Sequence, residues 1–297
     1  MKKIFILIIL SFLALSCPKK ILCTQEVNKF GIHILEPTDL AKAQELVNSS
    51  GGDWGWVTVV IRDDDMNQEK WQDFMDECRK RHLVPLVRIA THLEGKNWAK
   101  PKKEDVSKWL NFLKNLNWPV KDQYVIIFNE PNQAKEWGGE INPREYSQIL
   151  HEFTQQFHST NSNFKILNAG LDLAASNTKE TVDAFSFLSE MKKEIPEIFE
   201  NLDAWASHSY PNHGYLGKPW DTGKTSIRGY QTELEYLQKL GVKKEFDVFI
   251  TETGWPKDTP KITYITDKKG RKTIIKKKAK YYDPQTAANY PKSAFRG

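Results

Sequence analysis

Residues 56–61 read Trp56-Val57-Thr58-Val59-Val60-Ile61, a continuous apolar and β-branched run. Strands that are covered on both faces have this pattern, as they do in parallel sheets flanked by helices. Residues 38–50, which are ended by Gly51-Gly52, and residues 67–82 have helical spacing on either side of the run. The stretch therefore predicts a strand of a parallel sheet between two helices.

The same alternation of strand and helix continues along the chain. The other expected strands are residues 30–35, 84–90, 124–128, 166–169, 204–207 and 246–251. The other expected helices are residues 103–116, a helix that begins after Asn142, residues 181–200 with a break near Pro196, and residues 226–240 and 284–295. The helix after the fourth strand has the clearest start, because Asn142, Pro143 and Glu145 form a capping-box arrangement.

Seven strand–helix alternations indicate the α/β class, with a parallel sheet covered by helices. Right-handed crossovers then favour a barrel or a doubly wound sheet. Leu35-Glu36-Pro37 stands where a dinucleotide fold would carry a Gly-rich loop, so we predict a (β/α)8 TIM barrel. No residues remain for an eighth strand, so we expect a barrel that lacks this strand or a sequence truncated at its C-terminus.

The composition excludes several classes of protein. Hydrophobic residues make up 39% of the 297 residues and charged residues 27%, and the mean hydropathy is −0.59, which excludes a protein with several membrane spans. The 15 Phe, 10 Tyr and 10 Trp can fill a large core, which argues against wholesale disorder.

The positive charge is concentrated in one segment. Residues 257–280 have a net charge of +8, whereas the whole chain has a net charge of +5. The rest of the chain therefore has a net charge of −3. Residues 261–265 and 272–275 flank Asp267-Lys268-Lys269-Gly270, which predicts a basic β-hairpin insertion at 257–282 after the seventh strand. A solvated surface or contact with an anionic surface could explain the charge. No nucleic-acid motif accompanies it, so we expect no nucleic-acid partner.

Residues 1–24 have the pattern of an export signal. Lys2 and Lys3 precede an apolar run at residues 4–15 that is too short to span a membrane as a stable helix. The ending Leu13-Ala14-Leu15-Ser16-Cys17 resembles a bacterial lipobox, with Leu and Ala one place out of the usual order. Ordinary cleavage, lipidation of Cys17, or membrane attachment through an uncleaved segment each places residues 25–297 outside the cytoplasm, in the cell envelope or the extracellular space.

Chemically active side chains follow several of the expected strands. In such barrels the functional groups lie at the carboxyl ends of the strands. The candidates there are Arg62 after the second strand, Arg88 and His92 at the third, Asn129 and Glu130 after the fourth, His208 and Tyr210 after the sixth, and Glu252 after the seventh. Glu130 and Glu252 directly follow long apolar runs, and two facing carboxylates are what glycosidic hydrolysis requires.

Two short motifs carry a family resemblance. Asn129-Glu130-Pro131 and Thr251-Glu252-Thr253-Gly254-Trp255, whose glutamates are 122 residues apart, resemble the signatures of glycoside hydrolase clan A. The resemblance covers about residues 28–296 and is similar in style to family 5 cellulase-like or family 39-like members. It implies a retaining (β/α)8 enzyme that hydrolyses O-glycosidic bonds in a polysaccharide or oligosaccharide by double displacement.

The resemblance also implies a role for each matching residue. Glu252 would be the nucleophile and Glu130 the acid and then the base. Asn129 matches the residue that bonds the sugar 2-hydroxyl, and Tyr210 the strand-six residue that bonds the nucleophile, with His208 as its near neighbour. Arg62 matches the strand-two arginine that supports the nucleophile. Further expected sugar contacts are His92 and the aromatic residues Trp137 and Trp255, with Tyr215 and Trp220 as additional platform candidates.

Other interpretations of these residues remain open. The two glutamates could be structural partners of Arg62 and Arg88, His208 could be a core histidine, and Tyr210 could merely pack. Clan members often place an aromatic platform on strand eight, so the alternative function is a non-catalytic carbohydrate-binding barrel inactivated by the loss of that strand. A metal-dependent barrel needs a His/Asp cluster that the sequence does not reveal. We expect a carbohydrate substrate, a monomer and no cofactor, because side chains fill the acid–base and nucleophilic roles.

Overall fold

The computed structural model of the chain describes residues 28–49, 51–258, 261–266, 272–277 and 279–294. The predicted export signal, including Cys17, lies outside these residues. Within the described ranges, no helix combines the length and apolarity needed to cross a membrane.

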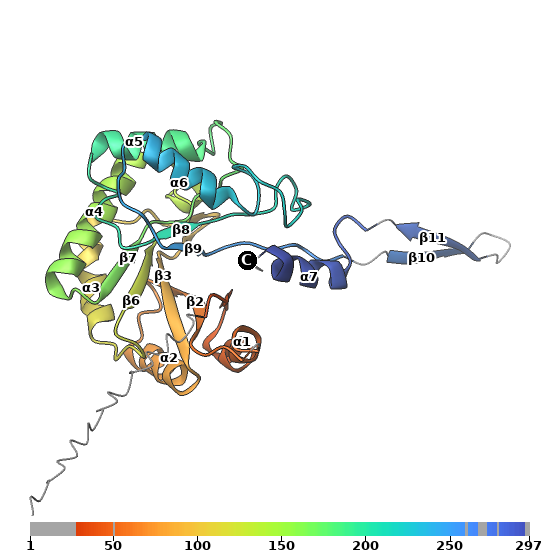
Figure 1. The fold of residues 1–297 in the computed structure, drawn as a ribbon, viewed down its shortest axis with the longest axis horizontal. Helices are drawn as coiled ribbons and strands as arrows, with labels where there is room; N and C mark the ends of the chain where they lie inside the picture. The colour runs from red at the N-terminus through yellow and green to blue at the C-terminus, as the bar shows by residue number, and fades with distance from the viewer. Residues whose placement is uncertain (1–27, 50, 259–260, 267–271, 278, 295–297) are drawn as a thin grey trace, which may run out of the picture.

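A parallel sheet forms the centre of the molecule (Figure 1). Five strands are hydrogen-bonded in the order β1-β2-β3-β6-β7, with bounds β1 (Gly31–His33), β2 (Gly55–Arg62), β3 (Leu83–Ala90), β6 (Gln123–Ile127) and β7 (Phe164–Leu167). β8 (Trp205–Ser207) and β9 (Val248–Ile250) pair in parallel, and a bridge between Leu167 and Ala204 continues the sheet from β7 to β8. Seven parallel strands thus follow one another in chain order, as predicted, and no pairing among the described residues joins β9 to β1.

All the helices but the last connect consecutive barrel strands and cover the outer face of the sheet, and the last lies between the barrel and the basic hairpin (Figure 1). They are α1 (Leu40–Val47), α2 (Gln68–Lys80), α3 (Val106–Lys114), α4 (Pro143–Thr160), α5 (Ala184–Glu194), α6 (Gly229–Lys239) and α7 (Pro284–Ala294). Short 3-10 turns precede α1 and α3, namely η1 (Pro37–Asp39) and η2 (Lys103–Asp105). The predicted break near Pro196 is present: the helix expected at 181–200 ends at Glu194, because the proline that follows disfavours helical backbone before it.

The start of α4 confirms half of the predicted capping box. The Asn142 side chain accepts a hydrogen bond from the Glu145 backbone N–H at 3.1 Å. Glu145 does not reach back to Asn142; its Oε2 instead accepts from Trp137 Nε1 at 2.8 Å and pairs with Lys100 Nζ at 2.9 Å. Glu145 therefore ties the helix start to the loop that follows β6.

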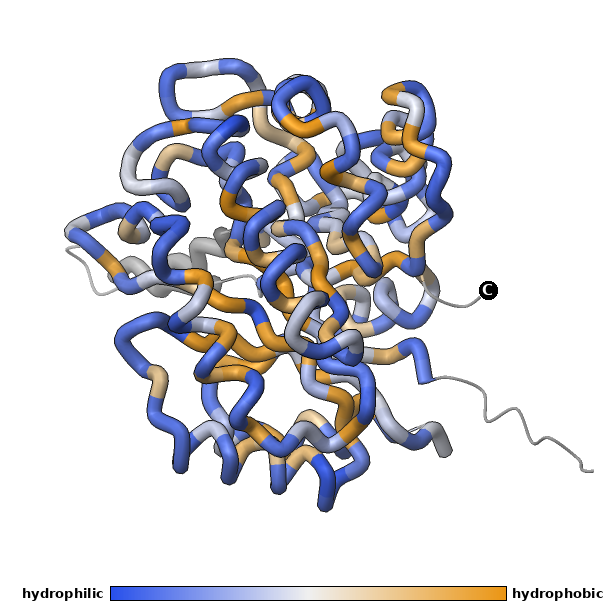
Figure 2. Tube along the Cα trace, turned by 90° about the vertical axis from the view of Figure 1, so that its left-hand side faces the viewer, coloured by the Kyte–Doolittle hydropathy of each residue, from blue (hydrophilic) through white to orange (hydrophobic). Residues whose placement is uncertain are grey.

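The central strands β2 and β3 are buried on both faces, which explains their continuous apolar runs. A large cluster packs the outer face against the helices and includes the fully buried Trp71 and Trp109. A smaller inner cluster contains Leu86 on β3, Ile126 on β6 and Leu167 on β7, as expected for a filled barrel interior. In Figure 2 hydrophobic residues follow the central strands, and hydrophilic ones dominate the outer turns. This packed core leaves the loops at the strand ends as the place for a site.

Two hairpins lie outside the barrel sheet. The predicted basic hairpin is present as β10 (Lys261–Thr266) and β11 (Lys272–Lys277), which pair antiparallel and extend away from the barrel (Figure 1). A second, very small hairpin of β4 (Leu93–Glu94) and β5 (Asn97–Trp98) was not predicted. Its two-residue strands are too short to give a sequence pattern, and it brings Trp98 to the strand-end face of the barrel.

Candidate active site

The carboxyl ends of β6, β8 and β9 bring Glu130, His208 and Glu252 together. One side-chain N or O atom from each lies within 4.8 Å of the other two. His208 Nδ1 is 2.9 Å from Glu130 Oε1 and 3.7 Å from Glu252 Oε2. The Tyr210 hydroxyl donates to Glu252 Oε2 at 3.2 Å. The two carboxylates therefore face one another, with the imidazole bridging them on one side.

The backbone that carries Glu130 is strained. Phe128 and Glu130 have φ values of 69° and 33°, in the left-handed region that residues other than glycine rarely adopt. Such conformations cost on the order of 1–3 kcal/mol each and persist where the surroundings impose them. Phe128 is buried against Trp137 and Phe153, and the Glu130 N–H donates to Gly170 O at 3.1 Å. Packing beneath the turn thus fixes where the Glu130 side chain emerges.

Both oxygens of the Glu130 carboxyl group have partners. His208 contacts Oε1, and Gln133 Nε2 donates to Oε2 at 2.6 Å and to Asp172 Oδ2 at 3.2 Å. The His208 ring is buried against Gly170, where an added Cβ would lie 2.2 Å from His208 Cδ2. A side chain at position 170 would therefore displace the imidazole from Glu130.

Positively charged side chains surround the Glu252 carboxylate. Arg88 on β3 donates to Glu252 Oε1 and, at 2.7 Å, to Asn129 Oδ1. Burial alone would raise the pKa of Glu252, but the charges of His208 and Arg88, together with the Arg88 hydrogen bond, lower it to about 2. Burial opposes protonation of His208 as well, but its hydrogen bond to Glu130 and the charge of Glu252 raise its pKa overall. Glu252 is therefore an ionised carboxylate at any ordinary pH.

Arg62 does not support Glu252, contrary to the sequence-based expectation. Its Nε pairs with Asp64 at 2.9 Å, and the Arg62 side chain is 44% exposed. Arg88 makes the contact instead. In the β2–β3 register Arg88 lies opposite Val60, two residues before Arg62, and so sits deeper in the barrel. Arg62 instead lines a cavity beside Arg88 and Asn129, which is described below. A role of Arg62 in substrate binding there stays a prediction.

Two further expected sugar contacts are placed elsewhere. Trp137 is fully buried, packs on Phe128 and Tyr146, and donates its Nε1–H to Glu145, so it is a structural residue and not a sugar platform. The His92 ring pairs with Asp63 at 3.0 Å and Glu94 at 3.3 Å and is outside the residues that line the cavity. Asp63 after β2 and Glu94 of β4 hold the ring in this position.

An aromatic recess lies on the Tyr210 side of the site. Trp255 is largely buried and donates its Nε1–H to Gly217 O at 2.7 Å. Together with Tyr210 and Tyr215 it lines a cavity of about 320 Å³. Trp220 is exposed nearby, in contact with Tyr290 of α7. Contact of sugar with Trp255, Tyr215 or Trp220 stays a prediction.

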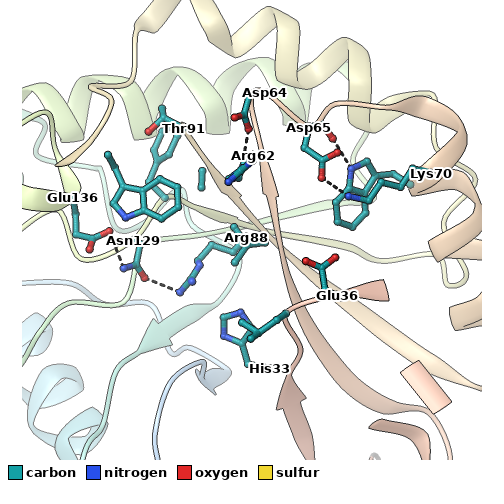
Figure 3. A pocket seen from close by; sticks show the side chains of 16 residues that line it. His33, Glu36, Arg62, Asp64, Asp65, Lys70, Arg88, Thr91, Asn129 and Glu136 are labelled. Atoms are coloured by element: carbon teal, nitrogen blue, oxygen red, sulfur yellow. Dashed lines mark hydrogen bonds and ion pairs between the residues drawn. The ribbon is translucent and has the colours of Figure 1, made fainter. Parts of the chain in front are cut away.

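A larger cavity, of about 700 Å³, opens beside Arg88 and Asn129 (Figure 3). Its walls come from the loops after β1, β2, β3 and β6, and its volume is within the usual range of about 300–1,000 Å³ for ligand sites. Its lining includes three cations and four carboxylates, namely Arg62, Lys70, Arg88, Glu36, Asp64, Asp65 and Glu136. Two of these cations are paired with aspartates inside the cavity, which suits a neutral ligand rich in hydroxyl groups.

Several residues of the site escaped the sequence analysis. Gln133 and Glu136 follow the strand-four motif closely, and the 3-10 turn η3 (Ala134–Glu136) folds them back over the strand end. Their position directly after Glu130 was the available signal. His33, at the end of β1, also lines the cavity beside Arg88 (Figure 3).

His33 makes folding stability depend on pH. Burial, followed by the charge of Arg88, lowers its pKa from 6.5 to about 4, and its Nε2 is buried without a hydrogen-bond partner among the described residues. Between pH 6.5 and 4 the unfolded chain binds a proton at this position that the folded chain does not, so stability falls as the pH is lowered through that window. With about 1.4 kcal/mol per pKa unit, the loss is about 3 kcal/mol.

We expect the variant His33→Gln to remove this acid sensitivity. Urea unfolding at pH 7 and pH 4 should show a loss of stability that is about 3 kcal/mol smaller in the variant than in the unmodified protein. Between pH 7 and 8 the imidazole is neutral in both states, so the two proteins should change in parallel there. Equal losses between pH 7 and 4 would show that His33 is not the responsible group.

The three side chains Glu130, His208 and Glu252 are close enough together to hold a metal ion. They are the group of this kind among the described residues. The His208 nitrogen that would ligate the ion is the one bonded to Glu130, and the raised pKa of His208 favours the imidazolium, which has no free lone pair. Arg88 also occupies Glu252 Oε1. These contacts suit proton transfer better than metal binding.

Comparison with known proteins supports the class of fold. No family model matches the chain, and no curated protein matches it. A monomeric beta-xylosidase from Caulobacter crescentus CB15 has a similar structure, with a TM-score of 0.55 and 13% identity over 76% of this chain and 52% of that one. Two fungal beta-1,4-galactanases are represented by a structure with a TM-score of 0.52 and 12% identity, covering 77% of this chain and 75% of that one. The fold is therefore that of TIM-barrel glycosidases.

One of the similar structures belongs to a group anticipated from the sequence. A GH39 beta-xylosidase from Caulobacter crescentus has a TM-score of 0.53 and 12% identity, covering 77% of this chain and 54% of that one. The chain thus spans about half the length of the xylosidases it resembles. The predicted resemblance to clan A glycoside hydrolases is confirmed at the level of the fold.

Proposed function

We propose that the chain is a retaining glycoside hydrolase in which Glu252 is the nucleophile and Glu130 the acid and base. The observation that carries this proposal is the pair itself, with a Glu130 oxygen within 4.8 Å of a Glu252 oxygen at the strand ends of a glycosidase-type barrel. Retaining enzymes hold their carboxyl groups about 5–5.5 Å apart, whereas inverting enzymes need about 6.5–9.5 Å to admit a water molecule. The short separation favours retention.

In the first step the Glu252 carboxylate attacks the anomeric carbon. The bond from that carbon to the leaving oxygen breaks, and Glu130 gives its proton to this oxygen. The low pKa of Glu252 supplies the ionised nucleophile, and the Arg88 and Tyr210 hydrogen bonds hold both of its oxygens in place. A glycosyl ester of Glu252 is the product of this step.

In the second step the Glu130 carboxylate takes a proton from water. The water oxygen attacks the anomeric carbon, and the Glu252 carboxylate leaves. His208 donates its Nδ1–H to Glu130 Oε1, so it stabilises the negative charge that Glu130 carries between the two steps. The two inversions return the original anomeric configuration.

The cavity next to the pair favours a neutral sugar chain as substrate. Its cations and carboxylates nearly balance and offer many donors and acceptors to hydroxyl groups. The similar structures are named for xylosidase and galactanase activities, and we extend the β-linked pentoside or hexoside class to this chain on that basis. The export signal expected at residues 1–24 would place the activity outside the cytoplasm.

Turnover and trapping test this proposal together. Aryl β-xylosides, β-glucosides, β-galactosides and β-mannosides would be assayed, with proton NMR used to identify the anomer that is released first. A 2-deoxy-2-fluoro glycoside with a good leaving group should then label the peptide that contains Glu252, as seen by mass spectrometry. Release of the inverted anomer would contradict the proposal. Sugar binding without any turnover would favour the non-catalytic carbohydrate-binding barrel.

A further inference from the structure

Glu136 is a carboxylate of the site that the proposed chemistry leaves without a role. Its side chain is 9% exposed and lines the large cavity. Its Oε2 accepts a hydrogen bond from Asn129 Nδ2 at 3.1 Å (Figure 3). The cation paired with it is Lys135, 3.6 Å from Oε1 and mostly exposed, and such a pair contributes little. Its main bond is therefore the one to Asn129.

The chemistry of the neighbours fixes the orientation of the Asn129 amide. Arg88 has only donors, so the Asn129 atom that faces it must be the oxygen. Nδ2 consequently faces Glu136, which accepts from it. An asparagine amide has two N–H donors and two acceptor sites, so one N–H and one lone pair remain for a ligand. Glu136 and Arg88 together decide where the remaining N–H points.

These contacts form a continuous chain across the site. Glu136 accepts from Asn129, Asn129 accepts from Arg88, and Arg88 donates to Glu252. Asn129 directly precedes Glu130 and lines the cavity. Its amide therefore lies between the two catalytic carboxylates and the space for the sugar. Rotation of this amide would change both the sugar contact and the acceptor available to Arg88.

We propose that Glu136 is a positioning residue that locks the Asn129 amide, so that its remaining N–H meets the hydroxyl group beside the anomeric carbon. The proposal rests on the proposed function for its kinetic consequence, but not for the orientation of the amide. Glu136 acts as a hydrogen-bond acceptor here. A glutamine could partly replace it through its carbonyl oxygen, whereas methionine, of similar length, could not.

An NMR measurement tests the orientation without any turnover. The side-chain amide signal of Asn129 would be assigned by its loss in Asn129→Ala. We expect Glu136→Met to shift this signal strongly and Glu136→Gln to shift it less. Glu140 is an exposed carboxylate in the same loop as Glu136 and pairs with Lys100. The control variant Glu140→Met should leave the Asn129 signal unshifted. An Asn129 signal that Glu136→Met does not move would overturn the proposal.

A substrate comparison tests the function of that orientation. On an aryl glycoside with a 2-hydroxyl group, Glu136→Met should lower kcat/KM by about 10–100-fold, the usual effect of removing an orienting partner. On the matching 2-deoxy glycoside the loss should nearly vanish, and Glu136→Met should add little to Asn129→Ala. Equal losses on both substrates, or additive losses in the double variant, would overturn the proposal. If no glycoside is turned over at all, the proposed function fails, and the NMR result still decides the orientation.

Discussion

Replacing Glu252 by glutamine is expected to lower kcat by about 10⁴-fold or more while the sugar still binds. The amide has the shape of the carboxylate. Its oxygen can still accept from Arg88, and its N–H can donate to the Tyr210 hydroxyl, so the site should remain folded. It has no negative charge with which to form a glycosyl ester. The measurement is kcat on an activated aryl glycoside, with the affinity for the free sugar determined by calorimetry.

A matched variant separates the chemistry at Glu252 from a general effect of losing a charge. Glu152 on α4 is a partly buried carboxylate that pairs with Lys103 at 2.8 Å on the outside of the barrel. Glu152→Gln should retain kcat within about threefold, because surface ion pairs contribute at most about 1 kcal/mol to stability. Residual activity of more than a few per cent in Glu252→Gln, or an equal loss in Glu152→Gln, would count against the nucleophile assignment.

The strands and the two glutamates could be predicted because their signals are local. β2 and β3 are covered on both faces, so residues 56–61 and 84–90 are almost uninterrupted apolar runs. A carboxylate directly after such a run lies at a strand end, and parallel strands bring their carboxyl ends to the same edge. The juxtaposition of Glu130 and Glu252 follows from this topology alone.

The arginine partner of Glu252 and the loop contacts around the pair could not be predicted, because they depend on register and on loop conformation. Arg62 and Arg88 are both near strand ends, and only the β2–β3 register shows that Arg88 lies deeper and reaches Glu252. Trp137 follows the strand-four motif as a sugar platform would, but the turn at Phe128 folds it into the core. The same loop brings Glu136 back to Asn129, a contact with no sequence pattern of its own.

Replacing Glu130 by glutamine should give a loss that depends on the leaving group. A sugar or alkyl leaving group needs a proton in the first step, so kcat/KM should fall by about 10²–10⁴-fold, the usual contribution of general acid catalysis. A dinitrophenolate leaves without a proton, so its kcat/KM should change little. The glutamine can still accept from His208 through its carbonyl oxygen, so the variant should keep its fold.

The second step gives this prediction its independent check. Without the Glu130 base, water attacks the glycosyl ester on Glu252 slowly, so the ester should accumulate and give a burst of dinitrophenolate. Azide is a nucleophile that needs no base, and it should restore kcat and yield a glycosyl azide with the configuration of the substrate. A loss of equal size for both leaving groups, without a burst and without rescue by azide, would mean that Glu130 supports the site structurally and transfers no proton.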